Sequence, residues 1–96
     1  MMETAHETQH VIRQLKTILV KDLQLDLRES DIADDVSLLE GGLALDSVVM
    51  AELIGHIEDQ FGFRFDDESL RENLFYNLTT LAEFIADKQQ AARKTA

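Results

Sequence analysis

The sequence contains neither cysteine nor proline. Without cysteine it can form no disulfide, offer no thiolate nucleophile and hold no cysteine-ligated metal, so any thiol chemistry must come from an imported group. The lack of proline, together with a hydrophobic content of 45%, favours a compact helical chain over a disordered one. No apolar run is long enough to span a membrane, and Met1-Met2-Glu3-Thr4 lacks the basic start of a signal peptide. We therefore expect a cytoplasmic protein that does not insert into membranes.

Basic residues are scarce, with nine Lys and Arg against nineteen Asp and Glu, which gives a net charge of −10. This balance argues against nucleic acid and anionic membranes as partners. The acidity is concentrated, because residues 29–72 hold thirteen acids and two bases, whereas residues 1–28 sum to zero and residues 73–96 sum to +1. A solvated acidic surface is the plainer interpretation. A field of one sign around one segment would also attract basic partner proteins.

The length of 96 residues predicts a single domain, 1–96, with frayed ends at about 1–4 and 92–96. Apolar residues at helical spacing predict a first helix over about 5–21, opened by the capping box Thr4-Ala5-His6-Glu7. A short helix is expected near 67–74, started by Asp66 or Ser69. A last helix over about 80–91 would open with the capping box Thr80-Leu81-Ala82-Glu83 and bury Leu81, Phe84 and Ile85.

We expect a long structured loop over residues 22–46. Its apolar residues would pin it to the core, and the candidates are Leu25, Ile32, Val36 and Leu38 or Leu39. One helical turn is expected within it, at Ser37-Leu38-Leu39-Glu40. A loop of this length in a compact domain needs a reason, and positioning the residue that follows it would supply one.

The strongest helical pattern covers about 47–61. At 100° per residue its inward face is apolar, formed by Met50, Leu53, Ile54, Ile57 and Phe61. Its opposite face is formed by Val48, Glu52, Gly55 and Asp59. Gly62 should end the helix, and Phe63 and Phe65 should anchor the connection that follows.

Ser47 stands at the junction between the loop and this helix, directly after Asp46. A serine at that place is expected to cap the helix start and to hold its hydroxyl at the surface. It is not expected to be a self-activated nucleophile, because the nearest histidine in sequence, His56, lies on the order of 13 Å away along the same helix.

Two other patterns suggest chemistry and do not hold up. His6-Glu7-Thr8-Gln9-His10 matches H-E-x-x-H, in which two histidines one turn apart share a zinc ion. It sits in the first turn of the first helix and lacks surrounding chain to build a third ligand site and a substrate cleft, so we expect it to be accidental. Asp31, Asp34 and Asp35 lack the spacing of a calcium-binding loop. We therefore expect no metal site.

The residues around Ser47 resemble a known family. Leu39-Glu40-Gly41-Gly42-Leu43-Ala44-Leu45-Asp46-Ser47-Val48 resembles the loop and Asp-Ser-Leu signature of acyl carrier proteins, and the resemblance extends over about residues 8–88. It implies an all-α four-helix bundle with three longer helices, a short third helix and a long loop between the first two. Val49 and the pair Phe75-Tyr76 are more similar to carriers of dedicated pathways than to the housekeeping one.

The resemblance also implies a function without catalysis. Ser47, with Asp46 as its motif neighbour, would receive 4′-phosphopantetheine from coenzyme A through a phosphopantetheinyl transferase. The thiol of that arm would carry acyl groups as thioesters for fatty-acid, polyketide or lipid-modification enzymes. We expect a monomer whose face of Val48, Glu52, Gly55 and Asp59 docks loading and transfer enzymes with basic patches. The alternatives are an aminoacyl or D-alanyl carrier, and an acidic helical interaction module without an arm.

Overall fold

The computed structural model describes residues 2–71 and 73–95, and their side chains over 6–70 and 73–91. The described residues contain helices and no strand. In chain order the elements are α1 (Met2–Thr17), the π-helix η1 (Ile18–Asp22), the 3-10 helix η2 (Glu29–Asp31), α2 (Ser47–Phe61), α3 (Asp67–Arg71), the 3-10 helix η3 (Asn73–Tyr76) and α4 (Leu78–Thr95). The predicted all-α fold, with three longer helices and a short third one, is confirmed.

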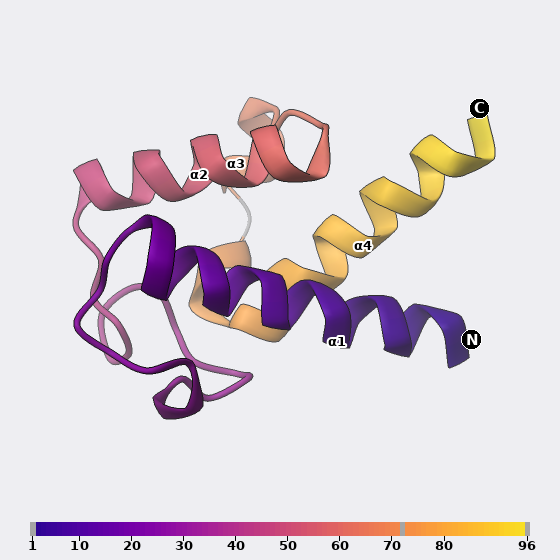
Figure 1. Cartoon of the computed structure of the whole chain (residues 1–96). Coiled ribbons are helices and arrows are strands. Elements are labelled where there is room, and N and C mark those ends of the chain that lie inside the picture. Colours follow the sequence, from indigo (N-terminus) through magenta and orange to yellow (C-terminus); the bar gives the residue numbers. More distant parts are fainter. Residues whose placement is uncertain (1, 72, 96) are drawn as a thin grey trace.

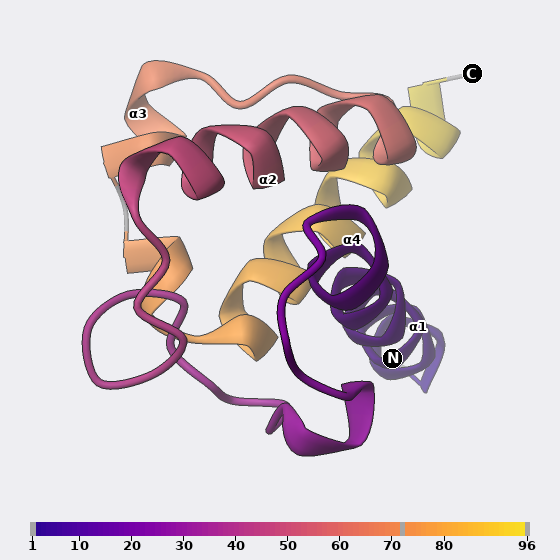
Figure 2. The same cartoon turned by 60° about the vertical axis from the view of Figure 1, so that its left-hand side comes forward.

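The bundle is built on the antiparallel pair α1 and α4, which pack against each other (Figure 1). Their outer ends, near the two chain termini, share one end of the molecule, and α2 lies across them. Figure 2 shows the loop between η1 and α2 curling around the end at which α2 begins. None of the helices described has the length and apolar character to cross a membrane.

Aliphatic side chains fill the space between these elements. The fully buried ones include Leu15, Ile18, Leu19, Leu38, Leu53, Ile57, Leu78, Leu81 and Ile85. The inward face predicted for α2 is confirmed, since Leu53, Ile57 and Phe61 are buried and Met50 and Ile54 pack partly against the core. Burying a leucine or isoleucine stabilises a fold by about 1.5–3 kcal/mol, so this face fixes how α2 lies on α1 and α4.

The long loop is held to the core as predicted. Ile32 and Leu38 are buried, and Leu25, Val36 and Leu39 pack partly against the core. The turn expected at Ser37-Leu38-Leu39-Glu40 is wrong, because the Ser37 Oγ accepts a hydrogen bond from the Leu39 N–H (3.1 Å) and closes a local turn that does not become helical. The helical turn of the loop is η2 instead.

Aromatic rings anchor the connection between α2 and α3, as predicted for Phe63 and Phe65. Phe65 stacks on Phe84 of α4 with 5.7 Å between centroids and meets Phe63 edge-on at 5.0 Å. Gly62 ends α2 in the left-handed conformation (φ 74°), and its N–H donates to the Glu58 carbonyl at 3.0 Å. The predicted end of this helix is therefore confirmed.

Two predicted helix starts are wrong. α1 begins at Met2, so Thr4 lies inside the helix and cannot cap it. α4 begins at Leu78 because Asn77 caps it, with Oδ1 accepting from the N–H groups of Thr79 (2.8 Å) and Thr80 (3.3 Å). α4 continues to Thr95, residues 1 and 96 lie outside the described residues, and fraying of the two ends stays a prediction.

The short helix expected near 67–74 forms two pieces, α3 and η3, with residue 72 outside the described residues. Asp66 caps α3 as predicted, because its Oδ1 accepts from the Ser69 N–H at 2.7 Å. Hydrogen bonds from the Ser69 backbone and side chain lower the pKa of Asp66 below its ordinary value.

Candidate functional site

Ser47 is the first residue of α2, and its side chain is exposed. The cap of the helix is Asp46, not Ser47 as predicted. The Asp46 Oδ1 accepts from the Val49 N–H at 2.9 Å, while its backbone is extended (φ −78°, ψ 174°). A carboxylate at the N-cap accepts a hydrogen bond from a first-turn amide and is stabilised by the positive end of the helix. The Ser47 hydroxyl is therefore left outside the helix and available.

No general base among the described side chains contacts the Ser47 hydroxyl. Among the described residues none makes a hydrogen bond with it, and His56 lies more than two turns along α2, half-buried. A serine hydroxyl is a poor nucleophile without a base within hydrogen-bond reach. The described residues thus give no sign that Ser47 is a self-activated nucleophile.

The loop before Ser47 is folded tightly on itself. The N–H groups of Leu43 and Leu45 donate to the carbonyls of Ser37 (2.8 Å) and Leu38 (2.9 Å). Gly42 lies so close to Ser37 that a Cβ there would overlap the Ser37 carbonyl oxygen. Ala44, three residues before Ser47, has a positive φ of 51°. These contacts set the direction in which the chain enters α2.

Backbone hydrogen bonds also tie this loop to distant parts of the chain. The Leu38 N–H donates to the Phe75 carbonyl (2.9 Å), and the Leu78 N–H donates to the Val36 carbonyl (2.8 Å). Asp34 adds a side-chain tie to α1, an ion pair with Lys16 (2.6 Å). Sequence reasoning missed the two backbone ties because a backbone hydrogen bond leaves no mark on residue type.

The outer face of α2 begins beside Ser47. Val48, Glu52, Gly55 and Asp59 are all exposed, as the helical periodicity predicted. Val48 has 66% of its surface accessible, which is unusual for a large apolar residue, and a Cβ at Gly55 would meet nothing within 4 Å. The helix thus presents one apolar side chain next to Ser47, followed by acids and an open glycine.

The sequence of residues 13–87 matches the family described as the phosphopantetheine attachment site. The chain belongs to this family. Comparison with curated proteins and with solved structures gave no match. Members of the phosphopantetheine attachment site family carry 4′-phosphopantetheine, are not catalytic, and are acted on by partner enzymes, with a phosphopantetheinyl transferase adding the group. The armless interaction module considered from the sequence is therefore set aside.

The start of α2 fits the prosthetic group of the phosphopantetheine attachment site family. A phosphodiester is an anion. The backbone N–H groups of Ser47 and Val48 lie in the first turn of α2, where amides have no carbonyl partner within the helix. The positive end of a helix stabilises a surface anion by about 0.3–1 kcal/mol. The exposed Ser47 leaves room for the group outside the bundle.

The H-E-x-x-H match lies on α1, outside the stretch that matches the phosphopantetheine attachment site family. His6 and His10 are exposed, and Glu7 accepts a hydrogen bond from Gln90 Nε2 of α4 at 3.0 Å. Within the described part of the chain, no three His, Asp or Glu side chains are grouped to hold a metal ion. Glu7 is thus engaged with α4, and the accidental nature of the match stays a prediction.

Proposed function

We propose that Ser47 is the residue that carries 4′-phosphopantetheine. The observation that carries this proposal is the exposed hydroxyl at the first residue of α2, freed from capping by Asp46 and lying inside the family match. A phosphodiester on Ser47 Oγ would meet the positive end of α2. The base that removes the hydroxyl proton would come from the transferase, because no described side chain forms a hydrogen bond with the Ser47 hydroxyl.

The cargo is proposed to be an acyl group. Since the chain has no cysteine, the thiol that holds the cargo must belong to the arm. We place the protein in the cytoplasm as a monomer that serves fatty-acid, polyketide or lipid-modification enzymes. An aminoacyl or D-alanyl carrier would use the same arm, and incubation of the loaded chain with acyl and aminoacyl ligases, followed by intact mass, distinguishes the two cargoes.

Partner enzymes are proposed to dock on the outer face of α2, formed by Val48, Glu52, Gly55 and Asp59. All four are exposed, on a face that begins beside Ser47, and they lie within the segment of charge −11. A partner with an apolar dent for Val48 and a basic rim for Glu52 and Asp59 would bind weakly and rapidly. Such binding suits a carrier that visits several enzymes in turn.

The attachment site is tested by intact mass. The purified apo chain, incubated with coenzyme A and a phosphopantetheinyl transferase, should gain the mass of one arm, and Ser47→Ala should gain none. Ser47 neither caps α2 nor packs in the core, so the variant should keep its fold by circular dichroism.

Ser30→Ala removes another exposed serine, in η2, and is the matched control that should be loaded normally. An arm that is still added to Ser47→Ala would show that another residue is the attachment site.

A further inference from the structure

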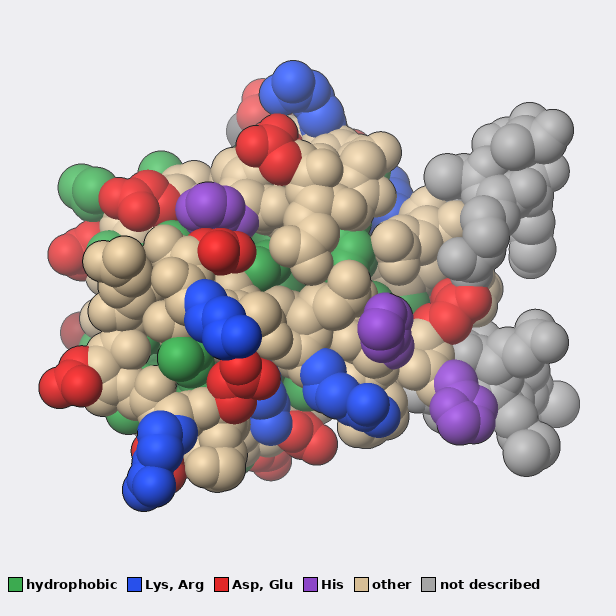
Figure 3. Space-filling model, viewed as in Figure 1, with side chains coloured by type: hydrophobic (Ala, Val, Ile, Leu, Met, Phe, Trp, Pro, Cys, Tyr) green, Lys and Arg blue, Asp and Glu red, His purple; other side chains and the backbone are tan. Residues whose placement is uncertain are grey.

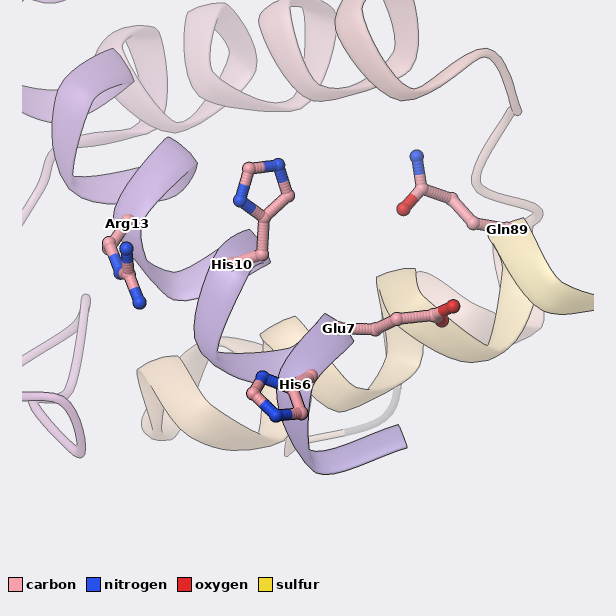
Figure 4. A pocket seen from close by; sticks show the side chains of 5 residues that line it. All are labelled: His6, Glu7, His10, Arg13 and Gln89. Atoms are coloured by element: carbon pink, nitrogen blue, oxygen red, sulfur yellow. The ribbon is translucent and has the colours of Figure 1, made fainter. Parts of the chain in front are cut away.

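A groove is lined by side chains of α1 and α4 (Figure 4). These parts of the two helices lie toward the end of the molecule away from the start of α2 (Figure 1). The lining side chains are His6, Glu7, His10, Arg13 and Gln89. Three of them, His6, His10 and Arg13, follow one another at helical spacing along α1, and all three are exposed. Neither the proposed attachment site nor the outer face of α2 uses these residues.

The groove is rich in hydrogen-bond donors. Imidazole, guanidinium and amide groups all offer N–H, and the guanidinium is always charged. The single carboxylate, Glu7, extends toward α4 in Figure 4 and accepts from Gln90 Nε2 at 3.0 Å. The Glu7 carboxylate keeps its charge but is directed toward α4, so the side chains left facing outward offer N–H donors to a ligand that bears negative charge.

Arg13 supplies a charge that the fold itself does not use. Among the described side chains, Lys16 pairs with Asp34, Arg28 with Asp31 and Arg64 with Glu58, and Lys88 lies 5.3 Å from the centroid of the Phe84 ring. Arg13 and Lys21 make no ion pair with any described residue, and only Arg13 lines the groove. Figure 3 shows two histidine side chains and a basic one gathered over α1.

We propose that this groove binds an acidic helical segment of a partner protein. His6, His10 and Arg13 rise along α1 in steps of about 6 Å and about 4.5 Å, at about 1.5 Å per residue. Glutamates spaced one turn apart on a partner helix have the same rise, so they would meet the three donors in register. A single small anion would reach only one or two of the three.

The net charge of −10 opposes an acidic partner, but the acids gather in residues 29–72. At physiological ionic strength, charges are largely screened beyond about 8 Å, so local donors decide what binds the groove. Because the groove and the start of α2 lie toward opposite ends of the molecule, a partner held at α1 would leave Ser47 accessible. The carrier could stay tethered while basic enzymes visit its other end.

The test uses the full, unmodified chain labelled with ¹⁵N and a synthetic helical peptide that carries glutamates at positions i, i+4 and i+7. The largest amide shifts are expected at His6, His10, Arg13 and Gln89, and none at Ser47. Arg13→Glu should weaken binding about fivefold, because it replaces an exposed attraction with a repulsion. Lys21→Glu changes the net charge equally outside the groove and should weaken binding by less than about twofold.

The arm takes no part in this binding, so the result is independent of the assignment of Ser47. Equal weakening by the two reversals would overturn the proposal, since only net charge would then matter. Free glutamate giving the same shifts at the same carboxylate concentration would also overturn it, as an adventitious ion only. Self-association through the groove would mean that a second copy is the occupant. Should Arg13→Glu fail to fold, Arg13→Gln and Lys21→Gln repeat the comparison.

Discussion

Ala44 holds a backbone conformation that side chains disfavour, with φ at 51° three residues before Ser47. The left-handed region costs an L-residue about 1–2 kcal/mol. The conformation persists because the hydrogen bonds of Leu43, Ala44 and Leu45 to residues 37–39 fix the loop on both sides. The surrounding contacts thus maintain the backbone strain at Ala44, near the proposed attachment site. A substitution at Ala44 can relieve this strain without changing any packed side chain.

Ala44→Gly should raise the free energy of unfolding by about 0.5–1 kcal/mol, since the strain removed exceeds the extra entropy of glycine in the unfolded chain. Urea unfolding measures the change. The control is Ala51→Gly, at an exposed position inside α2, which should lower the same free energy by about 1 kcal/mol. Equal losses in both variants would contradict the strain at Ala44.

Gly42 and Gly55 should respond in opposite directions to alanine. A Cβ at Gly42 overlaps the Ser37 carbonyl, whereas at Gly55 it meets nothing within 4 Å. Gly42→Ala should therefore destabilise the fold by about 1–3 kcal/mol and slow arm loading, because the loop leading to Ser47 must move. Gly55→Ala should stabilise it by about 1 kcal/mol through helix propensity. Thermal unfolding and the initial rate of loading check both variants, and a Gly42→Ala chain as stable as wild type would refute the overlap.

At the scale of elements, α2 was predicted over its whole length and α1 and α4 were not. The apolar face predicts the body of α2, and Gly62 predicts its end. Asp46-Ser47 predict its start, although the cap is Asp46 and not Ser47 as predicted. For α4, Thr80 and Glu83 formed a plausible capping box that competed with Asn77. Two candidate caps three residues apart cannot be ranked from local sequence, because tertiary contacts decide between them.

The cap of α3 makes the stability of the fold depend on pH. Hydrogen bonds from Ser69 lower the pKa of Asp66, so the ionised carboxylate is favoured in the folded state. Its contribution to stability is complete above the ordinary aspartate pKa of about 3.9 and is lost as pH falls through the lower folded value.

The free energy of unfolding of wild type should thus fall more steeply below about pH 4 than that of Asp66→Asn, which keeps a cap acceptor that does not titrate. Urea unfolding at a series of pH values measures both slopes, and all other carboxylates are common to the two chains. Parallel slopes would mean that the cap does not depend on the charge of Asp66.

At the scale of the whole molecule, the distribution of charge distinguishes two ends. The acidic segment 29–72 includes the start and outer face of α2, while His6, His10 and Arg13 lie on α1. The sequence alone revealed the acidic segment, because charge can be summed along the chain. It could not reveal the groove, since Gln89 and Gln90 meet α1 only through the packing of α4.

Glu52→Lys should slow arm loading by the transferase, with a loss of about 0.2–1 kcal/mol for one exposed contact and a further loss from the repulsion that replaces it. The effect should shrink as salt shortens the screening length. Glu7 is unsuitable as a control because it is bonded to α4, and the side chain of Glu3 lies outside the described residues. Glu83→Lys, exposed on α4, is the matched reversal. Equal slowing by both reversals would argue against docking on the outer face of α2.

The ties between the loop and residues 75–78 have a consequence for the order of events during synthesis. Leu38 and Val36 find their backbone partners, Phe75 and Leu78, in a part of the chain that follows Ser47. When Ser47 leaves the ribosome, this later segment, which helps to fix its position, has not yet left it. We therefore expect the nascent serine to be a poor substrate until the bundle has closed, because non-local contacts form last. The transferase would then add the arm only to newly made chains that have finished folding, so the arm would distinguish folded chains from unfolded ones.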